Sequence, residues 1–243
     1  MSERINRYLA RAGVASRRKA DELIRQGRVT IDGRIAQPGA RVPEGARVCV
    51  DRKPVRPQPH LHMLYNKPKG EIVARSDPRG RRTIFDTIPA PPHLQPIGRL
   101  DYDTEGLLLL TTDGALLQAL IRPEQGLVRE YRARIRGKLD EDDLARLMQG
   151  GIPIGRGDLS VPCEVIVERE LATNSWIRIK IRRGRWREVR RTLAAIGHPV
   201  LRLIRVRFGP IQLDPERDPP GTFRPLRRSE VRALYRAAGF DDA

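Results

Sequence analysis

The chain has 243 residues, of which 39% are hydrophobic, and it carries 47 Lys and Arg against 30 Asp and Glu, a formal net charge of +17. That length can bury the core of one large domain, or of a small domain joined to a larger one. So large a positive excess predicts nucleic acid as the partner. No apolar run is long enough for a membrane span, and the opening residues lack the apolar core of a secretory signal. We therefore expect a cytoplasmic protein with no membrane partner.

Cysteine and histidine usage disfavours two further classes of protein. Cys49 and Cys163 are too far apart to form a Cys-x-x-Cys motif, and the 4 histidines show no ligand spacing. Neither a disulfide framework nor a zinc site is supported, so we expect no metal and no cofactor.

The first fifty residues predict a small domain of helices and strands. Apolar residues recur at helical spacing over 5–12 and 16–26, with Ser16 placed to cap the second helix and Gly27 to end it. Asp32-Gly33 is a strong hairpin turn signal. Short strands are predicted at 29–31, 34–36 and 47–50.

Positive charge is concentrated at this end of the chain. Residues 1–58 hold 14 Lys and Arg and 6 Asp and Glu, a net charge of +8. Such a run is most often a solvated helix face, but solvated faces normally mix both signs. The bias therefore favours an RNA-facing surface. The basic residues on the polar side of the two helices are Arg7, Arg11, Arg17, Arg18, Lys19 and Arg25.

Residues 51–60 are rich in proline and have no apolar period, which predicts a semi-extended linker between two domains. After the linker we expect a short strand at 62–65 and a turn at 66–70. An exposed basic loop at 77–82 is followed by a core anchor at Ile84-Phe85.

The rest of the chain alternates short strands with helices. Strands are predicted at 130–136, 161–167, 176–181, 200–208 and 222–226. Helices are predicted from Asp113, around 144–148, over 187–196 and over 229–235. This order predicts an α+β domain with a mixed, mainly antiparallel sheet flanked by helices.

One polar loop leads directly into a run of four leucines. Residues 98–106 carry Asp101, Asp103 and Glu105, and Leu107–Leu110 suits a buried strand. Acids beside Gly and Thr are most often turn formers. The alternative is that a rigid strand holds a carboxylate where a substrate can reach it, as functional loops usually do.

A second basic stretch lies far from the first in sequence. Residues 178–207 hold eleven Lys and Arg and a single acid, Glu188. This stretch is a second candidate RNA-facing surface, and binding through it should weaken as salt rises.

Several of these stretches resemble one enzyme family. Residues 98–108 meet the pattern Gly-Arg-Leu-Asp-x-Asp-Thr-x-Gly-Leu-Leu without a gap, and resemble the catalytic-aspartate motif of the RsuA/RluB/RluE/RluF family of ribosomal RNA pseudouridine synthases. Residues 184–191 are similar to the third motif of that family, best in its RluB form, and 66–70 to its first. Residues 3–50 resemble the RNA-binding domain named after ribosomal protein S4.

The resemblance implies an S4-type domain at 1–50, a linker at 51–60 and a pseudouridine synthase catalytic domain at 61–243. It also implies that Asp101 is the catalytic carboxylate, that Arg190 pairs with it, and that Tyr131 stacks under the base and assists proton removal at C5. The expected reaction is site-specific isomerisation of a flipped-out uridine to pseudouridine in 23S, large-subunit ribosomal RNA, without a metal or cofactor.

Other residues receive supporting roles. We expect Arg99 to fill the gap that the flipped base leaves, and Arg185 and Arg187 to bind RNA with the basic residues of the first domain. Asp103 and Thr104 are interpreted as supports of the loop. Trp186 is expected to pack in the core, as large aromatic side chains mostly do.

Alternative functions stay open at the level of sequence. One is a small-subunit enzyme resembling RsuA, and another is a non-catalytic RNA-binding factor in ribosome assembly. A glycoside hydrolase using Asp101 with Asp103 or Glu105 is disfavoured, because carboxylates so close together cannot flank a sugar. We expect a monomer acting on a stem-loop of ribosomal RNA, since no heptad seam is visible.

Overall fold

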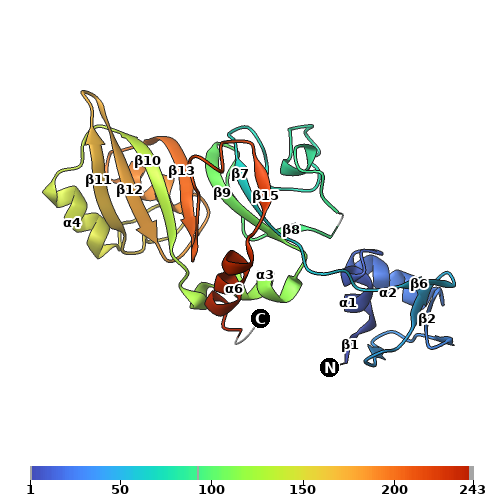
Figure 1. Cartoon of the computed structure of the whole chain (residues 1–243). Coiled ribbons are helices and arrows are strands. Elements are labelled where there is room, and N and C mark those ends of the chain that lie inside the picture. Colours follow the sequence, from blue (N-terminus) through green and yellow to red (C-terminus); the bar gives the residue numbers. More distant parts are fainter. Residues whose placement is uncertain (1, 92, 241–243) are drawn as a thin grey trace. The chain divides into compact units, whose positions relative to one another are not determined.

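A computed structural model of the chain describes residues 2–91 and 93–240, and Figure 1 shows its elements. The chain divides into two compact units. The first takes the residues up to His62 and two later segments, Pro89–Gln95 and Thr111–Gly114, which the sequence had placed in the catalytic domain. The second unit takes the rest of the chain.

The first unit pairs two helices with short strands, as predicted. Its elements are β1 (Glu3–Arg4), α1 (Ile5–Arg11), α2 (Arg17–Arg25), β2 (Val29–Ile31), β3 (Arg34–Ile35), β4 (Arg41–Val42), β5 (Val48–Val50) and β6 (Lys53–Val55). Ser16 caps α2 by accepting a hydrogen bond from the Lys19 backbone at 3.4 Å. Asp32 and Gly33 have φ of 47° and 81°, as the predicted hairpin turn requires. Ile5, Leu9 and Ile24 are buried against the sheet residues Val29 and Val48.

The predicted linker is partly wrong, because residues 53–55 form the strand β6. β6 lies at the edge of the β3-β2-β5-β6 sheet, with Pro54 opposite Cys49. Proline has no N–H to donate, and an edge strand needs donors on one side only. A proline-rich stretch can therefore complete this sheet.

A mixed sheet forms the second unit, in the order β11-β12-β10-β13-β9-β7-β15 over the described residues, with β14 on β13 and β8 on β9. Its strands are β7 (His62–Lys67), β8 (Gln95–Pro96), β9 (Thr104–Thr111), β10 (Arg129–Arg136), β11 (Glu164–Glu170), β12 (Asn174–Ile181), β13 (Val200–Phe208), β14 (Ile211–Gln212) and β15 (Phe223–Pro225). β10 is antiparallel to both its neighbours, whereas β13 and β9 run parallel. The predicted α+β class with a mixed, mainly antiparallel sheet is confirmed.

Helices cover this sheet and close its core. They are η1 (Ile84–Asp86), α3 (Gly114–Ile121), η2 (Pro123–Gln125), α4 (Glu141–Gln149), α5 (Glu188–Ala195) and α6 (Arg228–Ala237). α3 and α6 pack together beside β9, where Leu116 and Leu234 join one apolar cluster with Leu107 and Leu109 (Figure 1). Leu107–Leu110 are all buried, so both faces of β9 are covered, which explains a continuous leucine run in place of an alternating one.

Several boundaries differ from the sequence prediction, among them those of β7 and β11. β7 continues through Asn66 and Lys67, so the turn falls at Pro68–Gly70. β11 begins at Glu164, after the predicted start at 161, because Pro162 has no N–H and the Cys163 N–H donates to the Leu147 carbonyl oxygen.

Candidate active site

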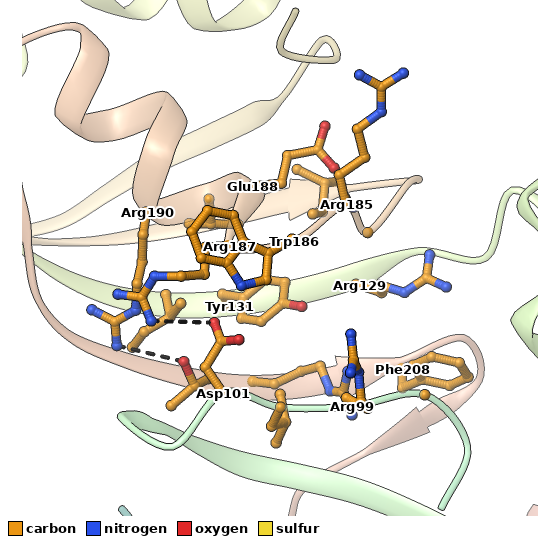
Figure 2. Close-up of a pocket in the computed structure, with 18 of the residues that line it drawn as sticks. Arg99, Asp101, Arg129, Tyr131, Arg185, Trp186, Arg187, Glu188, Arg190 and Phe208 are labelled. Atoms are coloured by element: carbon orange, nitrogen blue, oxygen red, sulfur yellow. Dashed lines mark hydrogen bonds and ion pairs between the residues drawn. The ribbon is translucent and has the colours of Figure 1, made fainter. Parts of the chain in front are cut away.

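A cavity of about 260 Å³ opens in the second unit where the loop before β9, the strands β10 and β13, and the loop before α5 meet (Figure 2). The predicted residues that the structure brings together there are Arg99, Asp101, Tyr131, Arg185, Arg187 and Arg190. They come from three distant parts of the sequence. The cavity is small and suits a single nucleoside better than a large ligand.

Asp101 is half-buried and lies in the polar loop, three residues before the first residue of the strand β9. Burial raises its pKa above the ordinary value, and the positive charge of Arg187 opposes that rise. Arg187 Nη1 is 3.6 Å from Asp101 Oδ2. A carboxylate beside a cation in a confined cavity is suited to act as a nucleophile or base.

Asp103 is the point at which two guanidinium groups hold the loop. Arg187 donates from Nη1 and Nη2 to its two carboxylate oxygens at 2.8 and 3.1 Å, and Arg190 donates from Nη2 to its backbone carbonyl oxygen at 2.8 Å. Burial alone would raise the pKa of Asp103, but the hydrogen bond from Arg187 and the charge of Arg190 hold this pKa below its ordinary value. The predicted supporting position of Asp103 agrees with these contacts.

The expected pairing of Arg190 with Asp101 is wrong in detail. The ion pair of Arg190 is with Asp103, at 3.4 Å, and the cation within ion-pair distance of Asp101 is Arg187. Arg187 stands in the left-handed region just before α5, with φ of 49°, so its side chain leaves the helix start toward the loop. Arg190 leaves the first turn of α5 and reaches the loop backbone instead.

Tyr131 forms the inner wall of the cavity. It lies on β10, is 9% exposed, and stands opposite Arg205 of β13 in the ladder.

Arg205 is buried and donates from Nε to the Leu107 carbonyl oxygen at 2.8 Å, and burial lowers its pKa. Among the described residues its Nη2 has no hydrogen-bond partner. Sequence reasoning missed this residue, because an arginine in an alternating strand is normally assigned to the solvent face.

Lys67 is a second residue that sequence reasoning missed. It is fully buried, and its Nζ donates to the carbonyl oxygens of Pro68 and Thr104, both at 2.9 Å. Burial lowers its pKa to about 8, although the nearby acids, Asp101 among them, oppose that shift. The available signal was the resemblance of residues 66–70 to the first family motif, which was noted without giving Lys67 a role.

Trp186 is exposed, which corrects the expectation that it packs in the core. Its side chain lines the cavity, 49% of the residue is exposed, and the Arg156 guanidinium lies 4.0 Å from its ring centroid. The neighbouring Arg99 and Arg185 are also exposed, and Arg185 forms an ion pair with Asp158.

Only part of the second basic stretch is available to RNA. Arg178 is bound by Glu130 and Glu168, Arg202 is paired with Glu105, and Arg205 is buried. Near the cavity, Arg182 and Arg185 are exposed, but Arg185 is paired with Asp158 and Arg187 with Asp103. The predicted second surface is therefore smaller than the charge count suggested.

The basic side chains on the two predicted RNA-facing helices of the first unit are also not equally open to solvent. Glu3 pairs with Arg7 at 3.9 Å and with Arg11 at 2.6 Å. Arg17, Arg18 and Lys19, at the start of α2, are exposed and keep their charges open to solvent.

Within the part of the chain that the structure describes, no group of three or more His, Cys, Asp or Glu could hold a metal ion. None of its helices is both long enough and apolar enough to cross a membrane.

Comparison with known proteins defines the class. The family model "RNA pseudouridylate synthase" matches residues 61–195, and the "S4 domain" model matches residues 3–48. An uncharacterized RNA pseudouridine synthase of Aquifex aeolicus is 41% identical, over 98% of this chain and 96% of that protein. Ribosomal large subunit pseudouridine synthase B is 38% identical in Salmonella typhimurium and 37% in Escherichia coli K12, in each case over 96% of this chain and 82% of the relative.

A solved pseudouridylate synthase structure has the same fold, with a TM-score of 0.66 and 27% sequence identity over 95% of this chain and 99% of that one. These matches define the class of the chain, an RNA-modifying enzyme with an S4 domain. The chain belongs to the RNA pseudouridylate synthase family. It isomerises uridine to pseudouridine in RNA.

Proposed function

We propose that this chain modifies one uridine of large-subunit ribosomal RNA, with Asp101 as the catalytic carboxylate. The observation that carries the residue assignment is the geometry of the cavity, where Asp101 faces Arg187 and Tyr131 forms the inner wall. The RNA target is supported by the relatives named large subunit pseudouridine synthase B, at 37–38% identity.

The reaction needs no group from outside the chain to balance. The N1–C1′ bond breaks while the carboxylate of Asp101 acts on the nucleoside, the uracil rotates, and a C5–C1′ bond forms. One proton leaves C5 and one is gained at N1, so substrate and product have the same composition. Arg187 favours the ionised carboxylate, because an opposite charge within a few ångströms stabilises it.

The other cavity residues take positioning and binding roles in this proposal. Tyr131 lies under the flipped uracil and assists proton removal at C5, for which its buried place on β10 is suitable. Arg190 and Asp103 fix the loop that carries Asp101. Arg99 is exposed at the cavity and fills the gap left in the RNA stack.

RNA binding outside the cavity falls to the two basic regions. Arg17, Arg18 and Lys19 contact phosphates from the S4 domain, with weaker contributions from Arg7 and Arg11, and Arg185 and Arg187 do so beside the cavity. These contacts position a stem-loop without reading its sequence. The proposed working form is a cytoplasmic monomer with an RNA-binding domain at 1–50 and a catalytic domain at 61–243.

Chemical mapping of pseudouridine in ribosomal RNA tests the proposal. In cells lacking this protein, one site in large-subunit RNA should lose its pseudouridine. The wild-type chain should restore the site, and Asp101→Asn should not, while the purified variant still binds the RNA. Loss of a site in small-subunit RNA would contradict the proposed target. Restoration by Asp101→Asn would contradict the assigned carboxylate.

A further inference from the structure

Trp186 is a large aromatic side chain placed where the fold does not need it. It is 49% exposed at the cavity, whereas Tyr131, in the same cavity, is 9% exposed. Figure 2 shows the indole projecting from its loop over the opening in which Asp101 and Tyr131 are seen. An exposed tryptophan beside a functional cavity contributes little to the core, so its ring is available to a ligand.

The loop that carries Trp186 is held firmly at several points. Arg191 donates to the Trp186 carbonyl oxygen at 3.1 Å and to the Ile154 carbonyl oxygen at 2.8 Å, and Glu188 accepts from the Arg185 backbone N–H at 2.8 Å. Asp158 binds both Arg185 and Arg191. The loop before α5 is thus fastened to the turn around residue 156, and the exposed ring is presented by a fixed backbone.

Cations flank the indole. The Arg156 guanidinium lies 4.0 Å from the ring centroid, and that of Arg191 lies 5.6 Å from it. Arg156 is itself in the left-handed region, with φ of 57°, between Gly155 and Gly157. Even with Arg156 over it, half of the residue stays exposed and part of it lines the cavity. An aromatic ring beside arginines is the combination that binds unpaired nucleobases by stacking next to phosphates.

We propose that Trp186 is a stacking platform for an unpaired RNA base next to the flipped uridine. The difference in depth supports this assignment, because the buried Tyr131 would meet the uridine inside the cavity and the exposed Trp186 would meet its neighbour in the strand. Arg156 and Arg185 then lie where the phosphates of that neighbour pass. The proposal rests on RNA modification at the Asp101 cavity, and it predicts that the chain binds unpaired RNA better than duplex RNA.

Intrinsic fluorescence tests the platform without requiring catalysis. The chain has 2 tryptophans, so Trp176→Phe leaves Trp186 as the reporter. Emission should be quenched, in a saturable way, by an oligouridylate of about ten nucleotides, since base stacking occurs over single-strand sites of that size. A blunt-ended RNA duplex of equal length should quench much less. Equal quenching by both, or unchanged emission at saturation of a labelled oligouridylate, would overturn the proposal.

Kinetics on a large-subunit RNA transcript provide a second, independent test. Trp186→Ala should raise KM about tenfold, equal to about 1.4 kcal/mol, with kcat nearly unchanged. Trp186→Phe should stay close to wild type because it keeps a ring, and both variants should melt at the wild-type temperature. An unchanged KM in Trp186→Ala, or a loss of kcat alone, would overturn the platform. If the wild-type chain forms no pseudouridine in this RNA, the proposed target fails, while the fluorescence result still decides the role of Trp186.

Discussion

Arg187 and Asp103 are joined by two hydrogen bonds, at 2.8 and 3.1 Å, and the same guanidinium lies 3.6 Å from Asp101. One cation therefore faces two carboxylates. The charge of Asp103 raises the pKa of Asp101, and Arg187 offsets that effect. The residue that fixes the loop is thus also the residue that favours the ionised form of the proposed catalytic group.

Removing this cation should shift the pH dependence of the reaction. Burial already raises the pKa of Asp101, so loss of the opposing charge in Arg187→Met raises it further. A reaction that needs the carboxylate then loses rate at a higher pH. We expect the acidic limb of the single-turnover rate, measured at saturating enzyme, to move to higher pH, as for loss of a nearby opposite charge.

A surface arginine far from the cavity provides the control. Arg217 is exposed and paired with Asp214, and Arg217→Met should keep the wild-type pH profile. If Arg187→Met lowers the rate equally at every pH, Arg187 positions the loop but does not favour ionisation of Asp101.

The features that depend only on residues close together in sequence could be predicted from the sequence. The leucine run of β9, the Ser16 cap and the Asp32-Gly33 turn all follow from local rules, and the structure contains each of them. Which guanidinium meets which carboxylate could not be predicted. That pairing depends on the angle at which α5 approaches the loop, and Arg187 and Arg190 share one motif.

The exposure of single side chains was equally hard to predict. Arg205 is buried and Trp186 exposed, the reverse of their usual environments. The position of Arg205 is set by its pairing with β9 and β10. That of Trp186 is set by the ion pairs of Asp158 with Arg185 and Arg191, which hold the loop before α5 against the turn around residue 156. Both are contacts between residues distant in sequence, which periodicity does not report.

The exposed cations at the start of α2 should control the salt dependence of RNA binding. Replacing Arg17, Arg18 and Lys19 by Gln removes three phosphate contacts in the proposed mode. The slope of log affinity against log salt should become shallower by about 2 to 3, since each contact contributes roughly 0.7 to 0.9. Filter binding to a ribosomal RNA transcript at several salt concentrations measures this slope. An unchanged slope would show that this end of the chain does not contact phosphates.

Gly106 should tolerate no side chain. It pairs with Arg205 in the parallel β9–β13 ladder, with φ of 105°, and a Cβ there would lie 2.9 Å from the Arg205 carbonyl carbon. Gly106→Ala should lower the free energy of unfolding by about 3 kcal/mol, from clash and backbone strain together. Gly114→Ala is the matched control, because a Cβ at Gly114 meets no atom within 4 Å, and urea unfolding of both variants measures the difference. Equal stability of the two variants would contradict the close approach of β9 and β13.

Lys67 should make stability rise with pH in the alkaline range. Its pKa falls from 10.5 to about 8 in the folded chain, mainly through burial. Between these values the unfolded chain binds more protons than the folded one, so raising the pH favours folding. The unfolding free energy of wild type minus that of Lys67→Met should therefore increase by about 2 kcal/mol between about pH 7 and pH 9.5.

Lys69 is exposed two residues away, so Lys69→Met is a control in the same segment. Urea unfolding of Lys69→Met over the same pH interval measures the effect of removing an exposed lysine from this segment. A flat difference for Lys67→Met would mean that Lys67 keeps its proton when buried. Its hydrogen bonds to Pro68 and Thr104 would then hold a charged group under the loop at all these pH values.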